Sequence, residues 1–136
     1  MKTKHRNLDF MIAKNHAGLQ LLLRGWVVQD LFFEGGPDLI AARKHHMLRV
    51  KVRYATKGDA GYVFSSGGLH EKTFFEVCEG SDVIVLVCLG GDKNAAGFYV
   101  FARDVSPKAK TFLHPVAGPF PKYKEFYNNW NVLQWK

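Results

Sequence analysis

The sequence predicts a single domain of the α/β class, with α+β as the alternative. Three observations carry this prediction: an opening stretch with helical hydrophobic spacing, two extended stretches joined by a tight turn, and a later continuous apolar run. This order of elements is typical of a sheet packed against helices. The chain has 136 residues, enough for one hydrophobic core. We therefore expect residues 1–136 to form one domain, with a central mixed β-sheet flanked by helices.

The first predicted element is a helix from about residue 7 to 24. Large apolar residues recur at helical spacing in this stretch: Leu8, Met11, Ile12, Leu19, Leu22 and Leu23. Asn7 is a suitable N-cap and Gly25 a suitable C-terminal stop, while Gly18 weakens the helix.

Extended structure is expected next. Residues 26–28 and 31–33 indicate a strand or two short extended pieces, and a Gly-Gly-Pro sequence at 35–37 then breaks the chain. Residues 38–43 and 47–55 are predicted to form a hairpin, with Lys-His-His at its turn. The two turn histidines, His45 and His46, are interpreted as solvated and not as metal ligands.

In the second half, residues 57–68 are rich in Gly and Ser and predict a loop, with a short strand at 62–64. A short helix or extended piece is expected at 71–77. Residues 83–89 are continuously apolar and rich in β-branched side chains, which is typical of a central strand buried on both faces. Residues 97–101 are its expected hairpin partner.

The C-terminal tail is expected to be irregular, because it contains three prolines after residue 114. A last short helix is predicted at 122–129. Three large residues near the end are expected to complete the core: Trp130, Leu133 and Trp135.

The charge of the chain points to a polyanionic partner. The formal net charge is +7 and the pI about 9.5, and most of the excess Lys and Arg lies before residue 60. Such a balance favours nucleic acid or an acidic membrane surface, with a solubility role as the alternative. No apolar run is long enough to span a membrane, and we expect no membrane partner.

The two cysteines, Cys78 and Cys88, lie in or beside apolar stretches, and no further Cys or His completes a metal-finger spacing. They are interpreted as core thiols of a protein in a reducing, cytoplasmic location. The basic N-terminus has no apolar segment behind it, so no signal peptide is expected.

The strand at 47–55 has two different faces, because side chains alternate along a strand. One face is apolar: Leu48, Val50, Val52 and Tyr54. The other carries three cations: Arg49, Lys51 and Arg53. Cations in a row repel one another unless anions neutralise them. Phosphate groups would do so, as would nearby acids such as Asp38; a solvated polar face is the alternative.

The sequence Gly36-Pro37-Asp38-Leu39-Ile40-Ala41, followed by Lys51-Val52-Arg53, resembles the motif of the PD-(D/E)XK nuclease superfamily. Similarity extends to the exit of the first helix at 21–28, the later strands at 81–87 and 97–101, and the closing segment at 123–133. The resemblance implies a restriction endonuclease-like core for most of the chain.

In that family two carboxylates hold Mg²⁺, which activates a hydroxide, and a lysine steadies the reaction. Here Asp38 matches the first acid, whereas Lys51 stands at the second acid position and Arg53 at the lysine position. Lys14 stands where many members carry a helix glutamate. An ammonium group repels a divalent cation, and an arginine stays protonated and cannot act as a base.

We therefore expect a nucleic-acid-binding protein, with DNA favoured, whose catalytic site is divergent and impaired. Arg49, Lys51 and Arg53 would contact phosphates, and Arg43 and Lys44 would add long-range attraction, so that binding is largely sequence-independent and salt-dependent. No cofactor is expected in this case.

Two alternatives stay open. The first is an active Mg²⁺-dependent endonuclease, in which Asp38 binds the metal, Lys51 and Arg53 complete the catalytic set, and Glu34, Asp30 or Asp9 supplies a relocated acid. The second is a structural or assembly protein that forms a homodimer through its apolar tail, at Phe120, Trp130 and Trp135.

Overall fold

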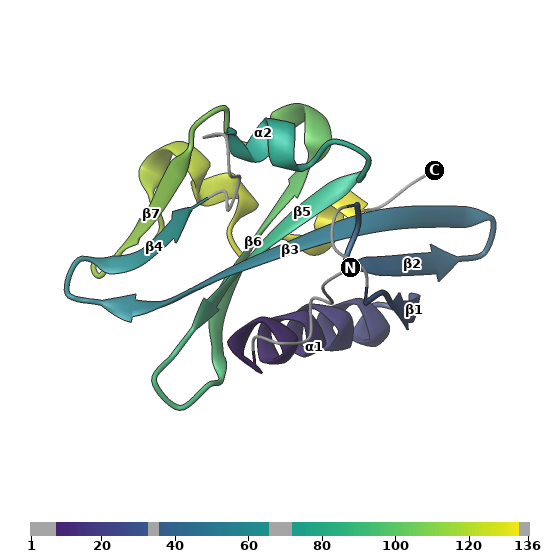
Figure 1. The fold of residues 1–136 in the computed structure, drawn as a ribbon, viewed down its shortest axis with the longest axis horizontal. Helices are drawn as coiled ribbons and strands as arrows, with labels where there is room; N and C mark the ends of the chain where they lie inside the picture. The colour runs from purple at the N-terminus through teal and green to yellow at the C-terminus, as the bar shows by residue number, and fades with distance from the viewer. Residues whose placement is uncertain (1–7, 33–35, 66–71, 134–136) are drawn as a thin grey trace.

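The computed structural model describes residues 8–32, 36–65 and 72–133. Asn7, Glu34 and Trp135, which the sequence interpretation invoked, lie outside these ranges. Seven strands form one mixed, largely antiparallel sheet, and one long helix packs against one of its faces (Figure 1). Within the described ranges, every helix is too short or too polar to cross a membrane.

Helix α1 (Leu8–Leu23) confirms the predicted first element. Gly25 follows it at φ +89°, a left-handed conformation that ends the helix at little steric cost. The buried face, however, is not the large apolar one that the spacing suggested. It consists of small residues, one leucine and one lysine: Ala13, Lys14, Ala17, Gly18 and Leu21.

The large residues of α1 lie outside instead. Leu19, Leu22 and Leu23 are 50%, 55% and 69% exposed. The reason is the short distance between α1 and the sheet: even a Cβ atom added to Gly18 would stand 3.7 Å from Val28 Cγ1. Only small side chains fit in so narrow a space. This steric limit outweighs the tendency of the larger apolar side chains to be buried.

Three antiparallel strands follow: β1 (Val27–Asp30), β2 (Leu39–Arg43) and β3 (His46–Gly58). The predicted hairpin is formed by β2 and β3, and Lys44 at its turn has φ 56°. Val50 and Val52 point into the core under α1, as the apolar face of this strand predicted.

Strand β5 (Val83–Leu89) pairs parallel to β3 and antiparallel to β6 (Ala95–Ala102). Every residue of β5 is buried, which confirms the prediction of a central strand covered on both faces. Its alternate side chains enter two separate hydrophobic cores. One lies under α1 and includes Trp130 and Leu133; the other lies under α2 and residues 112–127.

The short strand predicted at 62–64 is confirmed as β4 (Gly61–Ser65). The loop expected around it is shorter than predicted, because β3 continues to Gly58, turns, and pairs with β4. The tail is not wholly irregular, because β7 (Thr111–Pro115) pairs with β4 along its whole length. At Gly61, with φ +119°, any Cβ atom would collide with the backbone of β7, so this pairing requires glycine.

The short elements lie over both cores: those at 74–77 and 121–126 cover the second, and Trp130 and Leu133 of the last belong to the first. Helix α2 (Phe74–Val77) begins with a capping box between Thr73 and Glu76. In place of the helix predicted at 122–129 there are two 3-10 helices, η3 (Pro121–Phe126) and η4 (Trp130–Leu133), after η2 (Arg103–Val105). Trp130 and Leu133 are buried, as predicted, so Trp130 is not available for a homodimer contact. Both cysteines are buried free thiols, also as predicted.

Candidate nucleic-acid interface

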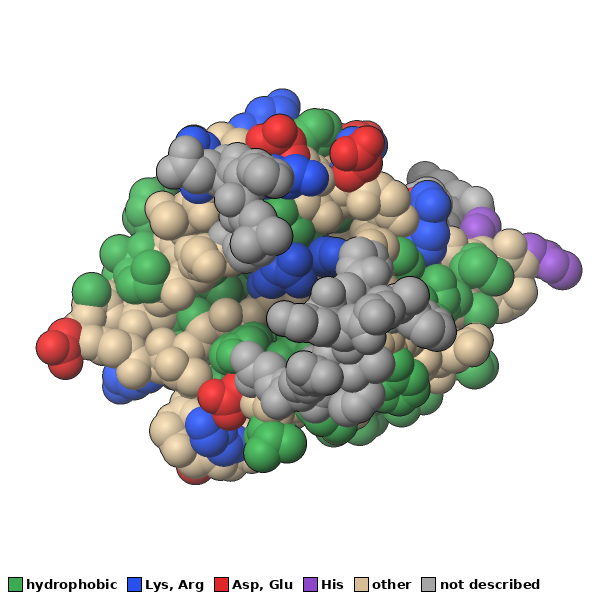
Figure 2. Space-filling view, viewed as in Figure 1, with side chains coloured by type: hydrophobic (Ala, Val, Ile, Leu, Met, Phe, Trp, Pro, Cys, Tyr) green, Lys and Arg blue, Asp and Glu red, His purple; other side chains and the backbone are tan. Residues whose placement is uncertain are grey.

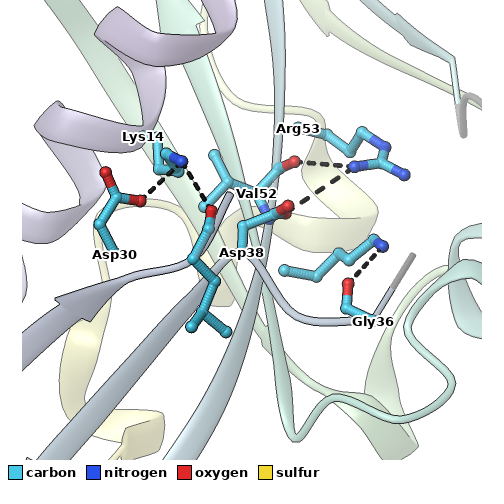
Figure 3. A network of polar contacts seen from close by, with 8 residues as sticks. Lys14, Asp30, Gly36, Asp38, Val52 and Arg53 are labelled. Atoms are coloured by element: carbon cyan, nitrogen blue, oxygen red, sulfur yellow. Dashed lines mark hydrogen bonds and ion pairs between the residues drawn. The ribbon is translucent and has the colours of Figure 1, made fainter. Parts of the chain in front are cut away.

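Asp38 lies at the entrance of β2 and is fully buried. Its Oδ2 accepts a hydrogen bond from the Val52 N–H on β3 (2.7 Å), and Arg53 Nη1 lies 3.9 Å from the same oxygen (Figure 3). Its own N–H donates to the Val50 carbonyl at 2.8 Å. The carboxylate therefore joins β2 to β3 and faces a cation.

Lys51 lies on β3, in the position where the sequence motif would place a second acid. Its side chain is buried, at 6% exposure, and Nζ donates to the Gly36 carbonyl at 2.7 Å. The ammonium group is thus held against the chain segment that leads into Asp38. A buried cation needs an oxygen partner, and the Gly36 carbonyl is such a partner for Lys51.

Arg53 points to the same face as Lys51, two residues further along β3. Its Nη1 donates to the Val52 carbonyl (3.0 Å). Burial lowers the pKa of this guanidinium, and the charge of Asp38 opposes the effect. Arg53 nevertheless stays a cation, because no protein environment of this kind deprotonates an arginine near neutral pH.

Lys14 is almost fully buried in α1, at 1% exposure. Its Nζ lies 2.6 Å from Asp30 Oδ1 and donates to the Leu31 carbonyl (3.0 Å) (Figure 3). The same Nζ stands over the ring of Phe32. Lys14, which the sequence resemblance matched to a helix glutamate, is therefore a second buried cation with its own counter-charge.

Two of the three acids proposed for relocation are paired with lysines. Asp30 pairs with Lys14, and Asp9 pairs with Lys93 at 2.9 Å. Glu34 lies outside the described residues. Within the part of the chain that the structure describes, no group of three or more His, Cys, Asp or Glu residues could hold a metal ion. The described donors do not fit a divalent cation, which needs several carboxylate or carbonyl oxygens directed at one point.

Arg49 is the third cation of the β3 row, and it is neutralised by a residue that the sequence interpretation missed. Asp82 accepts from Arg49 Nε (3.2 Å), Nη2 (3.1 Å) and the backbone N–H (2.8 Å). Burial pushes the pKa of Asp82 upward, but the hydrogen bonds and charge of Arg49 outweigh it and the pKa is lowered. A sign of this role in the sequence was the position of Asp82, which immediately precedes the central strand.

Arg43 and Lys44 lie at the other end of the β2–β3 hairpin. Arg43 stacks on the ring of Trp26 (4.5 Å) and donates to the Arg24 carbonyl. Lys44 and His45 are exposed at the turn and His46 is half-buried beside it. At about 3.3 Å per strand residue, Arg43 lies roughly 13 Å along β2 from Leu39, so the hairpin turn forms a separate basic region.

The cationic face is the face of β3 that carries Arg49, Lys51 and Arg53. Figure 2 shows Lys and Arg side chains in a recess over the middle of β3, on a face that also bears mixed acidic and basic groups near α2. The structure thus brings Asp38, Lys51 and Arg53 together, places Arg49 two residues further along the same face, and separates Arg43 and Lys44 from them.

No family model and no curated protein sequence matches the chain. The structure is similar to the solved structure of a bacterial homing endonuclease, I-Ssp6803I, with a TM-score of 0.70 over 98% of this chain and 92% of that chain, at 20% sequence identity. At this identity the similarity establishes the fold. The chain therefore has an endonuclease-like fold, and the resemblance to the PD-(D/E)XK type is confirmed at that level.

Proposed function

We propose that the protein binds nucleic acid, with DNA as the favoured partner, on an endonuclease-like fold whose catalytic site is divergent and impaired. The observation that carries the proposal is the Lys51 ammonium, held 2.7 Å from the Gly36 carbonyl at the position of the second acid. Together with Arg53 it makes the site cationic beside Asp38. Backbone phosphates are the ligands that Lys and Arg bind in nucleic acids.

The impaired chemistry follows from the charges. Asp38 accepts from the Val52 N–H and faces Arg53, and Asp30 and Asp9 are paired with lysines. A divalent cation near Asp38 would approach the ammonium of Lys51, which opposes its binding. A phosphodiester would instead be attracted by the same groups without a metal.

The comparison supports a polynucleotide as the partner, because the solved structure with this fold is that of a homing endonuclease. The net charge of +7 supports it independently. A reducing cytoplasm suits the two buried free thiols.

The test is binding of fluorescein-labelled duplex, single-stranded and branched DNA in EDTA, measured by anisotropy from low to moderate salt. We expect binding to the duplex that weakens with salt, and Lys51→Gln should reduce the slope of log K against log salt by about 1. Lys93→Gln is the matched control, because Lys93 pairs with Asp9 at the distant β5–β6 turn (Figure 1). Absence of binding to all three DNA forms at low salt would overturn the proposal.

Catalysis is tested separately with Mg²⁺ or Mn²⁺ and supercoiled plasmid. We expect no cleavage. Cleavage that disappears in Asp38→Asn would show that the site is active and would refute the impaired state, while leaving the binding data intact.

A further inference from the structure

A second cluster of charged groups lies next to the cationic face, across three strands. The sheet register places Arg49 of β3 beside Asp82 before β5, and Asp82 beside Arg103 after β6. The Arg103 N–H donates to the Asp82 carbonyl at 2.9 Å. These residues line a surface pocket of about 270 Å³ whose other walls are Gly80, Ser81, Ala102 and Asp104.

Two residues that line this pocket each carry a buried donor without an acceptor in the described part of the chain. Ser81 is 3% exposed, and its Oγ has no hydrogen-bond partner among the described residues. The buried Nε of Arg103 also has none within those ranges, and the guanidinium stacks on the ring of Phe75 at 4.9 Å. Buried polar groups without partners are rare and costly, so such a pair indicates a place that a ligand completes.

The missing partner is an acceptor. An arginine Nε–H can only donate, and a serine hydroxyl can donate as well as accept. The nearest carboxylate, Asp82, already accepts three hydrogen bonds from Arg49. A phosphate group, with several anionic oxygens, would satisfy both donors at once, and arginine favours that geometry.

We infer that this pocket binds a phosphate group, with Arg103 and Ser81 as the binding donors. The pocket adjoins the candidate nucleic-acid interface, because Arg49 precedes Lys51 by two residues, or about 7 Å, on the same strand face. The inference thus extends the proposed function: the phosphate is either part of a bound nucleic acid or part of a free small ligand. Two acids line the pocket: Asp82, which is paired with Arg49, and Asp104.

The experiment uses two probes. Inorganic phosphate is titrated into the ¹⁵N-labelled protein at constant ionic strength, and the Arg103 Nε–H and Ser81 amide signals are followed. Labelled duplex DNA is titrated in parallel over a range of salt. The variants are Arg103→Gln, Ser81→Ala and Asp104→Asn. Lys108→Gln is the matched control, because Lys108 stacks on the same Phe75 ring at 5.2 Å but does not line the pocket.

We expect Arg103→Gln to weaken phosphate binding about tenfold or more and Ser81→Ala about three- to tenfold. Asp104→Asn should tighten it by removing a repulsive charge. Arg103→Gln should also lower the DNA salt slope by about 1. Ser81→Ala should keep its thermal stability, because the Ser81 hydroxyl makes no hydrogen bond within the described chain; this separates binding from folding.

The outcomes distinguish the two proposals. If Arg103→Gln and Ser81→Ala bind both probes as Lys108→Gln does, the pocket inference is overturned, and DNA binding by the wild type still supports the proposed function. If inorganic phosphate perturbs Arg103 and Ser81 but no DNA binds at low salt, the pocket is supported with a free ligand and the proposed function fails. If neither probe binds, both are overturned.

Discussion

Replacing Asp38 separates its structural role from any catalytic one. In Asp38→Ala the Val52 N–H loses its acceptor inside the core, which costs about 1–3 kcal/mol. Arg53 also loses its counter-charge. Removing one partner of a buried ion pair costs about 3–5 kcal/mol. We reduce this term to about 1–2 kcal/mol because the Arg53 side chain is 24% exposed and the contact is long, at 3.9 Å.

The expected loss for Asp38→Ala is therefore about 2–5 kcal/mol, out of a total stability of roughly 7–20 kcal/mol for a domain of this size. Asp38→Asn keeps an oxygen for the Val52 N–H and should lose about 1–2 kcal/mol. Urea unfolding followed by the fluorescence of the buried Trp26 and Trp130 measures both. A loss below about 1 kcal/mol for Asp38→Ala would refute the argument from buried hydrogen bonding.

Three further perturbations test the packing. Lys14→Met should destabilise the fold by about 1–3 kcal/mol in urea unfolding, because Asp30 loses its cation; an unchanged midpoint would contradict this. Gly97→Ala should cost about 1–3 kcal/mol, because the new methyl group would overlap the ring of Tyr127; a melting temperature equal to the wild type would show that the ring moves freely. Burial lowers the pKa of His114, so its contribution to stability is present above its unfolded pKa of about 6.5 and is lost as the pH falls through the lower folded pKa. A His114→Phe variant should lose less stability than the wild type between pH 7 and 5, and parallel pH profiles would refute this.

Much of the fold was predictable because its signals are local. The continuous apolar run at 83–89 identified the buried central strand, and the alternation at 48–54 identified two different faces of β3. The motif at Asp38 and Lys51 was sufficient to predict the fold that the structural comparison supports. These signals depend on side chains within a few residues of one another. The periodicity of a strand or helix is therefore sufficient to identify them.

The errors have a common cause in contacts between distant parts of the chain. The pairing of β4 with β7 joins segments about 50 residues apart, so the strand expected at 62–64 was predictable but its partner strand was not. The apolar spacing predicted the helix α1 but not its buried face, where Ala17 and Gly18 fit a narrow space that Leu22 cannot enter. The spacing of hydrophobic residues shows which face of a helix is apolar. The distance between the helix and the sheet decides which face can be buried.

The sequence by itself determined the class of the fold, the order of its main elements and the cationic character of the site, because all three follow from residue type and local period. Only the tertiary structure decided how those cations are neutralised. It paired Arg49 with Asp82, 33 residues away, Lys14 with Asp30, and Arg53 with Asp38, and it brought Arg103 and Ser81 to one pocket. Strand register and the approach of the helix set these distances, and neither is encoded in the spacing of any single segment.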